Sequence, residues 1–245
     1  MDDIATPLIS IASPAYNEEE NIRDTVLDWR RILREEGIAG EIVITNDGSS
    51  DRTGEILRDL QTEMPELGVV THDTNYGYGK ALANAIMATK GEYVLTIDSD
   101  GQFDAGEYKC LLEKLQEDDA DLVTGFRMGK KDTAFRVLAD RVLHMIIRVL
   151  FGVSLRDTNC ALKLCKGDML RSLRFEAAGY PTPTEIVLRA NARGFKVSEV
   201  GITHRERQGG ISKLKPFKTG LKMLAFLLHL RIELWLYQLR IIHSL

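Results

Sequence analysis

The sequence predicts an α/β fold in which helices flank a mostly parallel sheet. Short apolar runs without strict alternation recur along the first half of the chain, as in strands that are covered on both faces. Amphipathic segments of helical length lie between these runs, as crossover helices do in parallel sheets. The 245 residues, of which 44% are hydrophobic, are enough for one sizeable core. We therefore expect a single α/β domain.

The expected strands and helices alternate. The strands are expected at 8–13, 41–45, 68–71 and 93–97, and the helices near 18–36, 52–63 and 79–89. Residues 135–151 form a further amphipathic helix with a polar side chain at every fourth position, and this helix either packs in the core or lies in a lipid interface. We expect a catalytic domain over residues 1–213, with halves 1–124 and 125–213, and a helical tail over 214–245.

Charge is distributed unevenly between these halves. Residues 1–124 hold 27 acidic and 10 basic residues, whereas residues 125–245 hold 9 acidic and 22 basic ones. This separation indicates that the second half faces an anion such as a phosphate or an acidic lipid surface. Nucleic acid is not expected as a partner, because no basic motif interleaved with aromatic residues is present.

Each expected strand ends in a polar segment. These segments read SPAYNEE, NDGSSD, DTNYGYGK and DSDGQ in chain order. The carboxyl ends of parallel strands meet at one edge of a sheet, where ligands bind in α/β folds, so all four segments should open on the same edge. The plain alternative is that Asn17, Asp51 and Asp104 cap helices and that Asp47 begins a turn. The chain lacks the glycine patterns of dehydrogenases and P-loop enzymes, which counts against both classes.

The fourth polar segment has the composition of a divalent metal site. Asp98 and Asp100 are one residue apart, so in extended backbone their side chains leave the same face, and the turn at Gly101 can bring Gln102 toward them. Oxygen ligands of this kind suit Mg²⁺ or Mn²⁺, and Mg²⁺ prefers few carboxylates together with a substrate phosphate. The sequence therefore predicts metal ligation by Asp98, Asp100 and Gln102, although a solvated turn or an acid/base pair of carboxylates would read the same.

These four segments, in this order and spacing, resemble the family 2 inverting glycosyltransferases of GT-A fold. Within that family the chain is similar to the dolichyl- and polyprenyl-phosphate sugar synthases. The resemblance covers roughly residues 7–215. Asn46 and Ser99 depart from the family's usual Asp-Asp-Gly-Ser and Asp-Ala-Asp patterns. The resemblance implies that the nucleotide sugar is bound by Pro14, Tyr16, Glu18, Asp47, Lys80, Asp98 and Ser99, while Asp100 acts at the metal.

The basic half offers candidates for the acceptor site. The resemblance places acceptor-phosphate arginines from residue 125 onward, which implies Arg127 first and Arg136 or Arg141 after it. A guanidinium suits this task because its planar fork binds phosphate oxygens bidentately. The alternative is that these arginines lie on solvated helix faces.

A second basic segment is similar to the closing loop of the polyprenyl-phosphate sugar synthases. It follows the pattern Arg-x-x-Gly-x-Ser-Lys, and its glycines let the backbone fold over a ligand. Arg207 and Lys213 would then stabilise the leaving nucleoside diphosphate as the glycosidic bond breaks.

The tail is apolar but repeatedly interrupted by charge. Its longest uncharged run is Met223 to Leu230, whereas about 20 residues are needed to span a bilayer. We therefore expect no transmembrane helix and a peripheral attachment, with Trp235 and Tyr237 at headgroup depth. A tail that packs on a second copy of the chain would have the same sequence pattern. Residues 1–8 carry no export signal, so a location at the cytoplasmic face of the membrane is expected.

The predicted activity is transfer of a hexose from a nucleotide sugar, of the GDP-mannose or UDP-glucose type, to a polyprenyl phosphate with inversion. A phosphate acceptor needs no general base, whereas a sugar hydroxyl needs one, and Glu185 is the candidate base in that case. Glu185 is equally consistent with an acid in the first turn of a helix. The alternatives are a family 2 glycosyltransferase with a glycan or other hydroxyl acceptor and a non-catalytic membrane-peripheral scaffold of the same fold.

Overall fold

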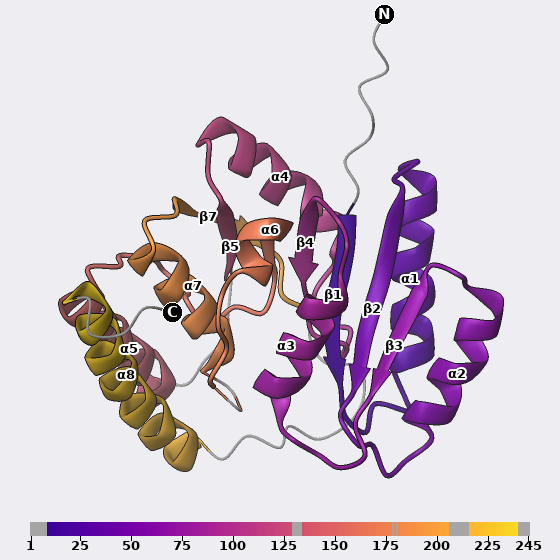
Figure 1. Ribbon diagram of the computed structural model, residues 1–245, viewed down its shortest axis with the longest axis horizontal. Helices are drawn as coiled ribbons and strands as arrows, with labels where there is room; N and C mark the ends of the chain where they lie inside the picture. The colour runs from indigo at the N-terminus through magenta and orange to yellow at the C-terminus, as the bar shows by residue number, and fades with distance from the viewer. Residues whose placement is uncertain (1–8, 129–133, 178, 180, 206–215, 240–245) are drawn as a thin grey trace, which may run out of the picture.

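The computed structural model describes residues 9–128, 134–177, 179, 181–205 and 216–239. Its centre is a seven-stranded sheet in the order β3-β2-β1-β4-β6-β5-β7 (Figure 1). The strands are β1 (Ile9–Ala15), β2 (Gly40–Asn46), β3 (Leu67–Thr71), β4 (Tyr93–Thr96), β5 (Leu122–Arg127), β6 (Lys163–Lys166) and β7 (Val197–Ile202). The helices are α1 (Ile22–Glu35), α2 (Thr53–Glu63), α3 (Tyr78–Ala88), the 3₁₀ helix η1 (Ala105–Glu107), α4 (Tyr108–Glu117), α5 (Ala134–Phe151), α6 (Gly167–Arg171), α7 (Thr182–Ala192) and α8 (Pro216–Gln238).

The first half of the chain forms the predicted parallel sheet. β1 pairs in parallel with β2 and β4, and β2 pairs in parallel with β3. The predicted elements of this half are confirmed, with ends displaced by at most four residues. Because β4 returns to the side of β1 opposite β2, strand order switches between β1 and β4, and a ligand crevice is expected beyond the carboxyl ends of these two strands.

One strand of the second half runs against the others. β6 lies between β4 and β5 and is antiparallel to both. Its four residues, KLCK, contain no apolar run, so no strand was predicted there. The reversal means that β6 begins at the edge where β4 ends, because Lys163 pairs with Thr96. The segment that leads into β6 therefore reaches the same edge as the polar segments of the first half.

Helices cover both faces of the sheet. α1, α2 and α4 pack on one face around a core that includes Trp29, Leu57 and Leu111. The other face is covered by α3, α6 and α7, with α5 and α8 beyond them, around a core that includes Leu82 and Leu227 (Figure 1). This arrangement explains why the strands of the first half read as continuous apolar runs.

The tail helix α8 is attached to the domain by apolar contacts and by buried charge. Met223, Leu227, Leu230 and Leu234 are buried on one side of α8. The fully buried guanidinium of Arg189 donates to both carboxylate oxygens of Glu233, at 3.0 and 2.9 Å. The predicted boundary at residue 213 falls outside the described residues.

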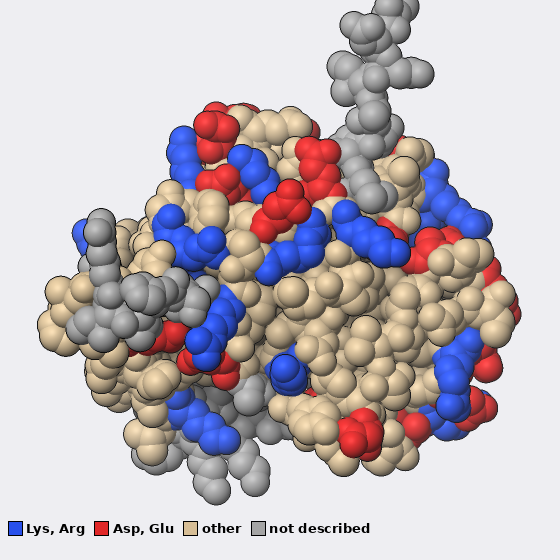
Figure 2. Space-filling model, viewed as in Figure 1, with Lys and Arg blue, Asp and Glu red and all other residues tan. Residues whose placement is uncertain are grey.

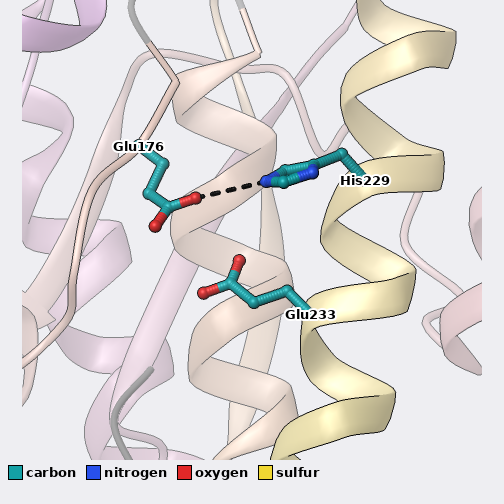
Figure 3. Close-up of side chains that lie close together, drawn as sticks. All are labelled: Glu176, His229 and Glu233. Carbon is teal, nitrogen blue, oxygen red and sulfur yellow. Dashed lines mark ion pairs between the residues drawn. The ribbon is translucent and has the colours of Figure 1, made fainter. Parts of the chain in front are cut away.

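Three side chains gather beside this guanidinium. Glu176, which lies between α6 and α7, faces His229 and Glu233 of α8, and its carboxylate is 3.5 Å from His229 Nε2 (Figure 3). Arg189 lies 3.7 Å from Glu176 and already supplies positive charge to the group. Glu176, His229 and Glu233 therefore take part in the attachment of α8 to the domain.

The opposite side of α8 exposes apolar side chains. Those at least one third exposed on α8 and just beyond its end are Leu221, Leu224, Leu228, Ile232, Trp235 and Leu239, and α5, which packs beside α8, adds Val142, Met145 and Val149. We call these nine residues the apolar face. Figure 2 shows uncharged residues over much of the left edge of the molecule, where α8 lies. Among the described helices, none combines the length and apolarity needed to cross a bilayer.

Candidate active site

The polar segments after β1 and β2 are joined side by side. Asn17 has a positive φ of 54° and accepts a hydrogen bond from the backbone N–H of Ser50 at 2.8 Å. Asn17 therefore links two loops. The alternative that it caps α1 is wrong, because α1 begins after Asn21. Asp51 accepts from the backbone N–H of Thr53 at 2.9 Å, and Asp104 accepts from that of Gly106 at 2.8 Å, so both do serve helix starts.

Asp47 holds the next segment in place. Its carboxylate is buried and accepts from the backbone N–H groups of Tyr76 and Gly77, each at 2.8 Å. His72 Nδ1 lies 2.7 Å from the same carboxylate, and Asn84 contacts the other ring nitrogen of His72 at 2.8 Å. Asp47 thus links the end of β2 to the start of α3, a structural task that its predicted role in nucleotide binding did not anticipate.

The two predicted acidic ligands lie where β4 meets this edge. Asp98 is partly buried, and its Oδ1 accepts from the Tyr78 hydroxyl at 2.8 Å. Burial raises the pKa of Asp98 to about 7, and the nearby Asp100 carboxylate adds to the rise, against the hydrogen bond from Tyr78 and the charge of Arg127. A carboxylate that is desolvated beside a second carboxylate is disfavoured as an anion unless a cation joins the pair.

Ser99 and Gln102 complete this segment in different ways. Ser99 is buried, and its hydroxyl donates to the carbonyl oxygen of Pro14 at 2.8 Å, so it ties the end of β4 to β1. Gly101, at a φ of 73°, makes the predicted turn, after which the Gln102 backbone N–H donates to Asp100 Oδ1 at 3.1 Å. The amide nitrogen of Gln102 donates to the carbonyl oxygen of Arg205, which leaves its amide oxygen as the ligand atom.

The residues brought together fit a divalent cation. Two carboxylates and one amide supply hard oxygen atoms, and the repulsion between the carboxylates provides the electrostatic reason for a cation to bind. The charge of Arg127 acts on Asp98 in favour of its ionised form, although less strongly than burial and Asp100 act against it. The edge would hold a metal with few protein ligands and would leave room for phosphate oxygens.

Arg127 borders the acidic pair from the second half of the chain. It ends β5, and its Nε donates to Asp157 in the segment before β6, with both side chains largely withdrawn from solvent. Burial alone would lower the pKa of Arg127, but the carboxylates of Asp157 and Asp140 raise it, so the guanidinium stays charged. Residues 156–160 were a candidate acceptor segment, but no role was predicted for Asp157 itself. Its carboxylate also accepts from the backbone N–H of Asn159 at 3.2 Å, an Asx turn whose sequence gives no sign of the contact with Arg127.

A buried lysine supports the same segment. Lys163 is fully buried at the start of β6 and donates to the Thr124 hydroxyl at 2.9 Å and to the carbonyl oxygens of Thr158 and Cys160. Burial lowers the pKa of Lys163. The burial of Lys163 was not predicted, because a lysine in a short strand of partly charged residues gives no sign of burial.

The segment after β7 also contacts the segment that carries Asp98, Asp100 and Gln102. The Arg205 backbone N–H donates to the carbonyl oxygen of Gln102 at 2.9 Å, and the ring of His204 packs against that of Phe103 with centroids 5.0 Å apart. Arg207 and Lys213, the predicted loop residues, lie outside the described residues. Arg205, the described residue that precedes them in the chain, is hydrogen bonded to Gln102.

The other predicted residues lie on separate elements. Tyr16 and Glu18 follow β1, and Lys80 is exposed in the first turn of α3. Arg141 is exposed on α5; Arg136 belongs to the same helix, but its side chain is outside the described part of the structure. The structure thus groups Asp98, Asp100, Gln102 and Arg127, whereas contacts of Lys80 and Arg141 with a ligand stay predictions.

Glu185 is engaged within the protein. It lies in the first turn of α7, fully buried, and accepts from the backbone N–H groups of Glu176 and Ala177 at 2.9 Å each. Arg189 Nε donates to the same carboxylate at 2.8 Å. This arrangement matches the first-turn acid of the plain reading and gives Glu185 a structural task.

Two curated relatives share most of this chain. It is 30% identical over 215 residues to the undecaprenyl-phosphate 4-deoxy-4-formamido-L-arabinose transferase of Pectobacterium carotovorum subsp. carotovorum, a match that covers 87% of this chain and 64% of the relative. It is 26% identical over 232 residues to the low-salt glycan biosynthesis hexosyltransferase of Haloferax volcanii, covering 92% of this chain and 54% of that protein. The chain therefore spans less than two thirds of the length of these relatives.

A solved structure and a family model complete the comparison. The glucosyl-3-phosphoglycerate synthase of Mycobacterium tuberculosis, crystallised with Mn²⁺, UDP and glucosyl-3-phosphoglycerate, matches with a TM-score of 0.69 at 23% identity, over 92% of this chain and 80% of that one. This likeness confirms the predicted fold class. Residues 10–170 match the model of glycosyl transferase family 2. The match includes the acidic pair, Arg127 and Asp157, and the chain belongs to glycosyl transferase family 2.

Proposed function

We propose that this chain transfers a sugar from a nucleoside diphosphate sugar to a polyprenyl phosphate at a membrane surface, with the help of a divalent cation. The observation that carries the proposal is the position of the Arg127–Asp157 pair, which shares one sheet edge with Asp98, Asp100 and Gln102. One group is suited to a cation and a diphosphate, and the other supplies a fixed positive charge for an anionic acceptor. The name of the Pectobacterium relative, which specifies undecaprenyl phosphate, supports the choice of acceptor.

In the proposed reaction, an oxygen of the acceptor phosphate attacks the anomeric carbon. The bond from that carbon to the diphosphate oxygen breaks, its electron pair leaves with the nucleoside diphosphate, and the configuration inverts. A divalent cation held by Asp98, Asp100 and Gln102 would neutralise negative charge on the diphosphate. Arg127 orients the acceptor phosphate, whose second pKa of about 6 leaves it largely dianionic at neutral pH, so no protein group has to remove a proton.

The basic loop completes the proposed donor site. Arg205 is hydrogen bonded to Gln102, a proposed metal ligand, and Arg207 follows Arg205 by two residues in the sequence. Arg207 and Lys213 are proposed to approach the diphosphate oxygens as they gain charge. We propose a UDP sugar and Mn²⁺ or Mg²⁺ as the first donor and cations to test, since the mycobacterial neighbour was crystallised with UDP and Mn²⁺.

The apolar face is proposed to lie on lipid. Its residues on α8 recur every three or four positions and form one stripe, with Trp235 near the end of the helix. The exposed basic residues Arg141, Arg148 and Lys222 on the same two helices would meet acidic headgroups. Attachment to lipid through this face would hold the protein at the surface that contains the proposed acceptor.

A transfer assay tests the proposal. The purified protein is incubated with radiolabelled UDP-glucose, UDP-N-acetylhexosamine or GDP-mannose, polyprenyl phosphate and Mg²⁺ or Mn²⁺, and the lipid is then extracted. Label in the organic phase is expected with the wild type and not with Asp100→Asn, while Asp168→Asn, which changes an exposed acid at the opposite end of the sheet, should match the wild type. Label confined to soluble glycan would favour a hydroxyl acceptor, and absence of label with every donor would contradict the enzymatic proposal.

A further inference from the structure

The hydroxyl of Tyr78 is hydrogen bonded to Asp98, a proposed metal ligand. It donates to Asp98 Oδ1 at 2.8 Å, and it reaches this carboxylate from the first turn of α3. Carboxylates that bind metals usually accept a second hydrogen bond, which fixes their rotamer and selects the oxygen that faces the metal. The hydrogen bond to Oδ1 therefore restricts the directions in which Asp98 can present its oxygens to a cation.

The backbone before Tyr78 is fixed by Asp47. The buried carboxylate accepts from the backbone N–H groups of Tyr76 and Gly77, so the two residues that precede Tyr78 are bound to the end of β2. Gly77 has a φ of 95°, a conformation that other residues rarely adopt, and α3 begins directly after it. The start of α3 is therefore set by a buried charge and a glycine.

The backbone after Tyr78 is fixed by close packing. A Cβ on Gly79 would lie 1.8 Å from the carbonyl oxygen of Ala177 and 2.2 Å from the Thr182 hydroxyl. The first turn of α3 therefore touches the segment before α7 at backbone distance. Held on both sides, Tyr78 can move its hydroxyl very little relative to β4.

The surroundings of Asp98 explain why its orientation needs such support. The negative charges of Asp100 and Glu18 act on Asp98, and Arg127 acts with the opposite sign. The hydrogen bond from Tyr78 opposes rotation of the Asp98 carboxylate within this field. The Tyr78 hydroxyl is a neutral donor, so it can hold Asp98 without competing with a cation for the charge.

We infer that Tyr78 is a positioning residue for the metal ligand Asp98, and that Asp47 acts on the metal site through the Tyr76–Gly77 backbone and Tyr78. The inference rests on the proposed function, because it assumes that Asp98 binds a cation. It assigns a role in metal affinity to two residues that touch neither the cation nor the reacting atoms.

The test compares Tyr78→Phe with Tyr93→Phe. Tyr93 is the first residue of β4, whereas Asp98 follows the last residue of this strand. The control therefore removes a tyrosine hydroxyl at the end of β4 that is remote from Asp98. Binding of Mn²⁺ is measured by the loss of the free-ion electron paramagnetic resonance signal, with UDP and, separately, GDP present. We expect Tyr78→Phe to weaken Mn²⁺ binding by about tenfold or more, in the range found for residues that orient metal ligands, and Tyr93→Phe to leave it unchanged.

Two further measurements separate positioning from general stability. The melting temperature of the metal-free protein should be similar in the two variants, whereas the rise produced by Mn²⁺ and nucleotide should shrink only in Tyr78→Phe. Asp47→Asn, which keeps the shape but loses the charge that binds two backbone N–H groups, should also weaken Mn²⁺ binding when no nucleotide is present, so that its predicted contact with the nucleotide does not contribute.

The outcomes distinguish the inference from the function it rests on. Equal Mn²⁺ affinity in Tyr78→Phe and the wild type would overturn the inference and leave the proposed function intact. A wild type that takes up no Mn²⁺ with either nucleotide would overturn both. Weaker binding accompanied by an equal loss of metal-free stability would reduce Tyr78 to a packing role and would also overturn the inference.

Discussion

Arg127 and Asp157 form an ion pair at 2.7 Å although thirty residues separate them in the chain. The side chains are only 20% and 14% exposed, so the pair is shielded from solvent. Because Asp157 engages Nε, we propose that a ligand phosphate meets the terminal nitrogens of the Arg127 guanidinium. The pair thus places a charged fork at a fixed angle beside the acidic edge.

Removing the charge of Asp157 should weaken the acceptor site selectively. In Asp157→Asn, Arg127 loses its partner and its fixed orientation, so we expect the KM for polyprenyl phosphate to rise about tenfold, which corresponds to about 1.4 kcal/mol. The KM for the donor should change little, and steady-state kinetics with each substrate varied in turn measures both. Asp168→Asn is the control, because it breaks an exposed pair with Arg171 away from this edge. A rise in the donor KM alone would contradict this placement of Arg127.

The pH dependence of metal binding should follow Asp98. Burial and the Asp100 carboxylate raise the pKa of Asp98 to about 7, so below pH 7 the metal-free site holds a proton that a cation must displace. We expect the apparent affinity for Mn²⁺ to fall as the pH is lowered from 8 to 6, with release of protons on binding. Calorimetry in buffers of different ionisation enthalpy measures the proton release. An affinity that is flat across this range would contradict the assignment.

The same shift predicts the pH dependence of metal-free stability. The pKa of Asp98 is higher in the folded protein than its ordinary value of 3.8, so its stabilising contribution is complete below pH 3.8 and is lost as the pH rises through about 7. Asp98→Asn removes this titration. Chemical denaturation without metal should therefore show the variant gaining stability relative to the wild type between pH 5 and pH 8. A constant difference between the two proteins would be inconsistent with a raised pKa.

Replacement of Glu185 should act chiefly on stability. Glu185→Gln leaves Arg189 with less compensation and disturbs the acceptor of two backbone N–H groups, so the free energy of unfolding should fall by about 1–3 kcal/mol, as for other unsatisfied buried groups. Activity with a phosphate acceptor, measured well below the melting temperature, should stay within about threefold of the wild type, a change of less than 1 kcal/mol. A variant of unchanged stability that has lost activity would instead identify Glu185 as a base and favour a hydroxyl acceptor.

The apolar face should govern binding to lipid. Leu228→Glu combined with Trp235→Glu places two charges on its central stripe and should abolish co-sedimentation with vesicles that contain acidic phospholipid. Met87→Glu is the control, because Met87 is exposed on α3, away from α5 and α8. Size-exclusion chromatography of the same proteins tests the other occupant of this face. Loss of a dimer without any change in vesicle binding would show that a second copy covers it.

The polar strand ends could be predicted from sequence because each is a local pattern. The run from Val94 to Ile97 is apolar and is followed at once by Asp98 and Asp100, and the parallel order of the first half places this segment beside β1. The antiparallel β6 could not be predicted, since its residues are partly charged and its pairing depends on β4 and β5, which are distant in the chain.

The supporting residues could not be predicted for a related reason. Tyr78, Asp157 and Lys163 act through contacts with partners 20, 30 and 39 residues away, namely Asp98, Arg127 and Thr124. No periodicity or short motif records such contacts. Glu185 shows the limit from the other side, because its position before an apolar helix suggested chemistry, whereas its engagement with Arg189 became visible only in three dimensions.

The reversed direction of β6 has a consequence for how the protein can diversify. The segment from Gly152 to Leu162 enters the edge from the opposite direction to the donor segments, and it is anchored at its end by Lys163. Replacing this segment would therefore leave every residue of β1, β2 and β4 unaltered. A chimaera that carries the corresponding segment of a relative is expected to change its acceptor while retaining its own nucleotide preference.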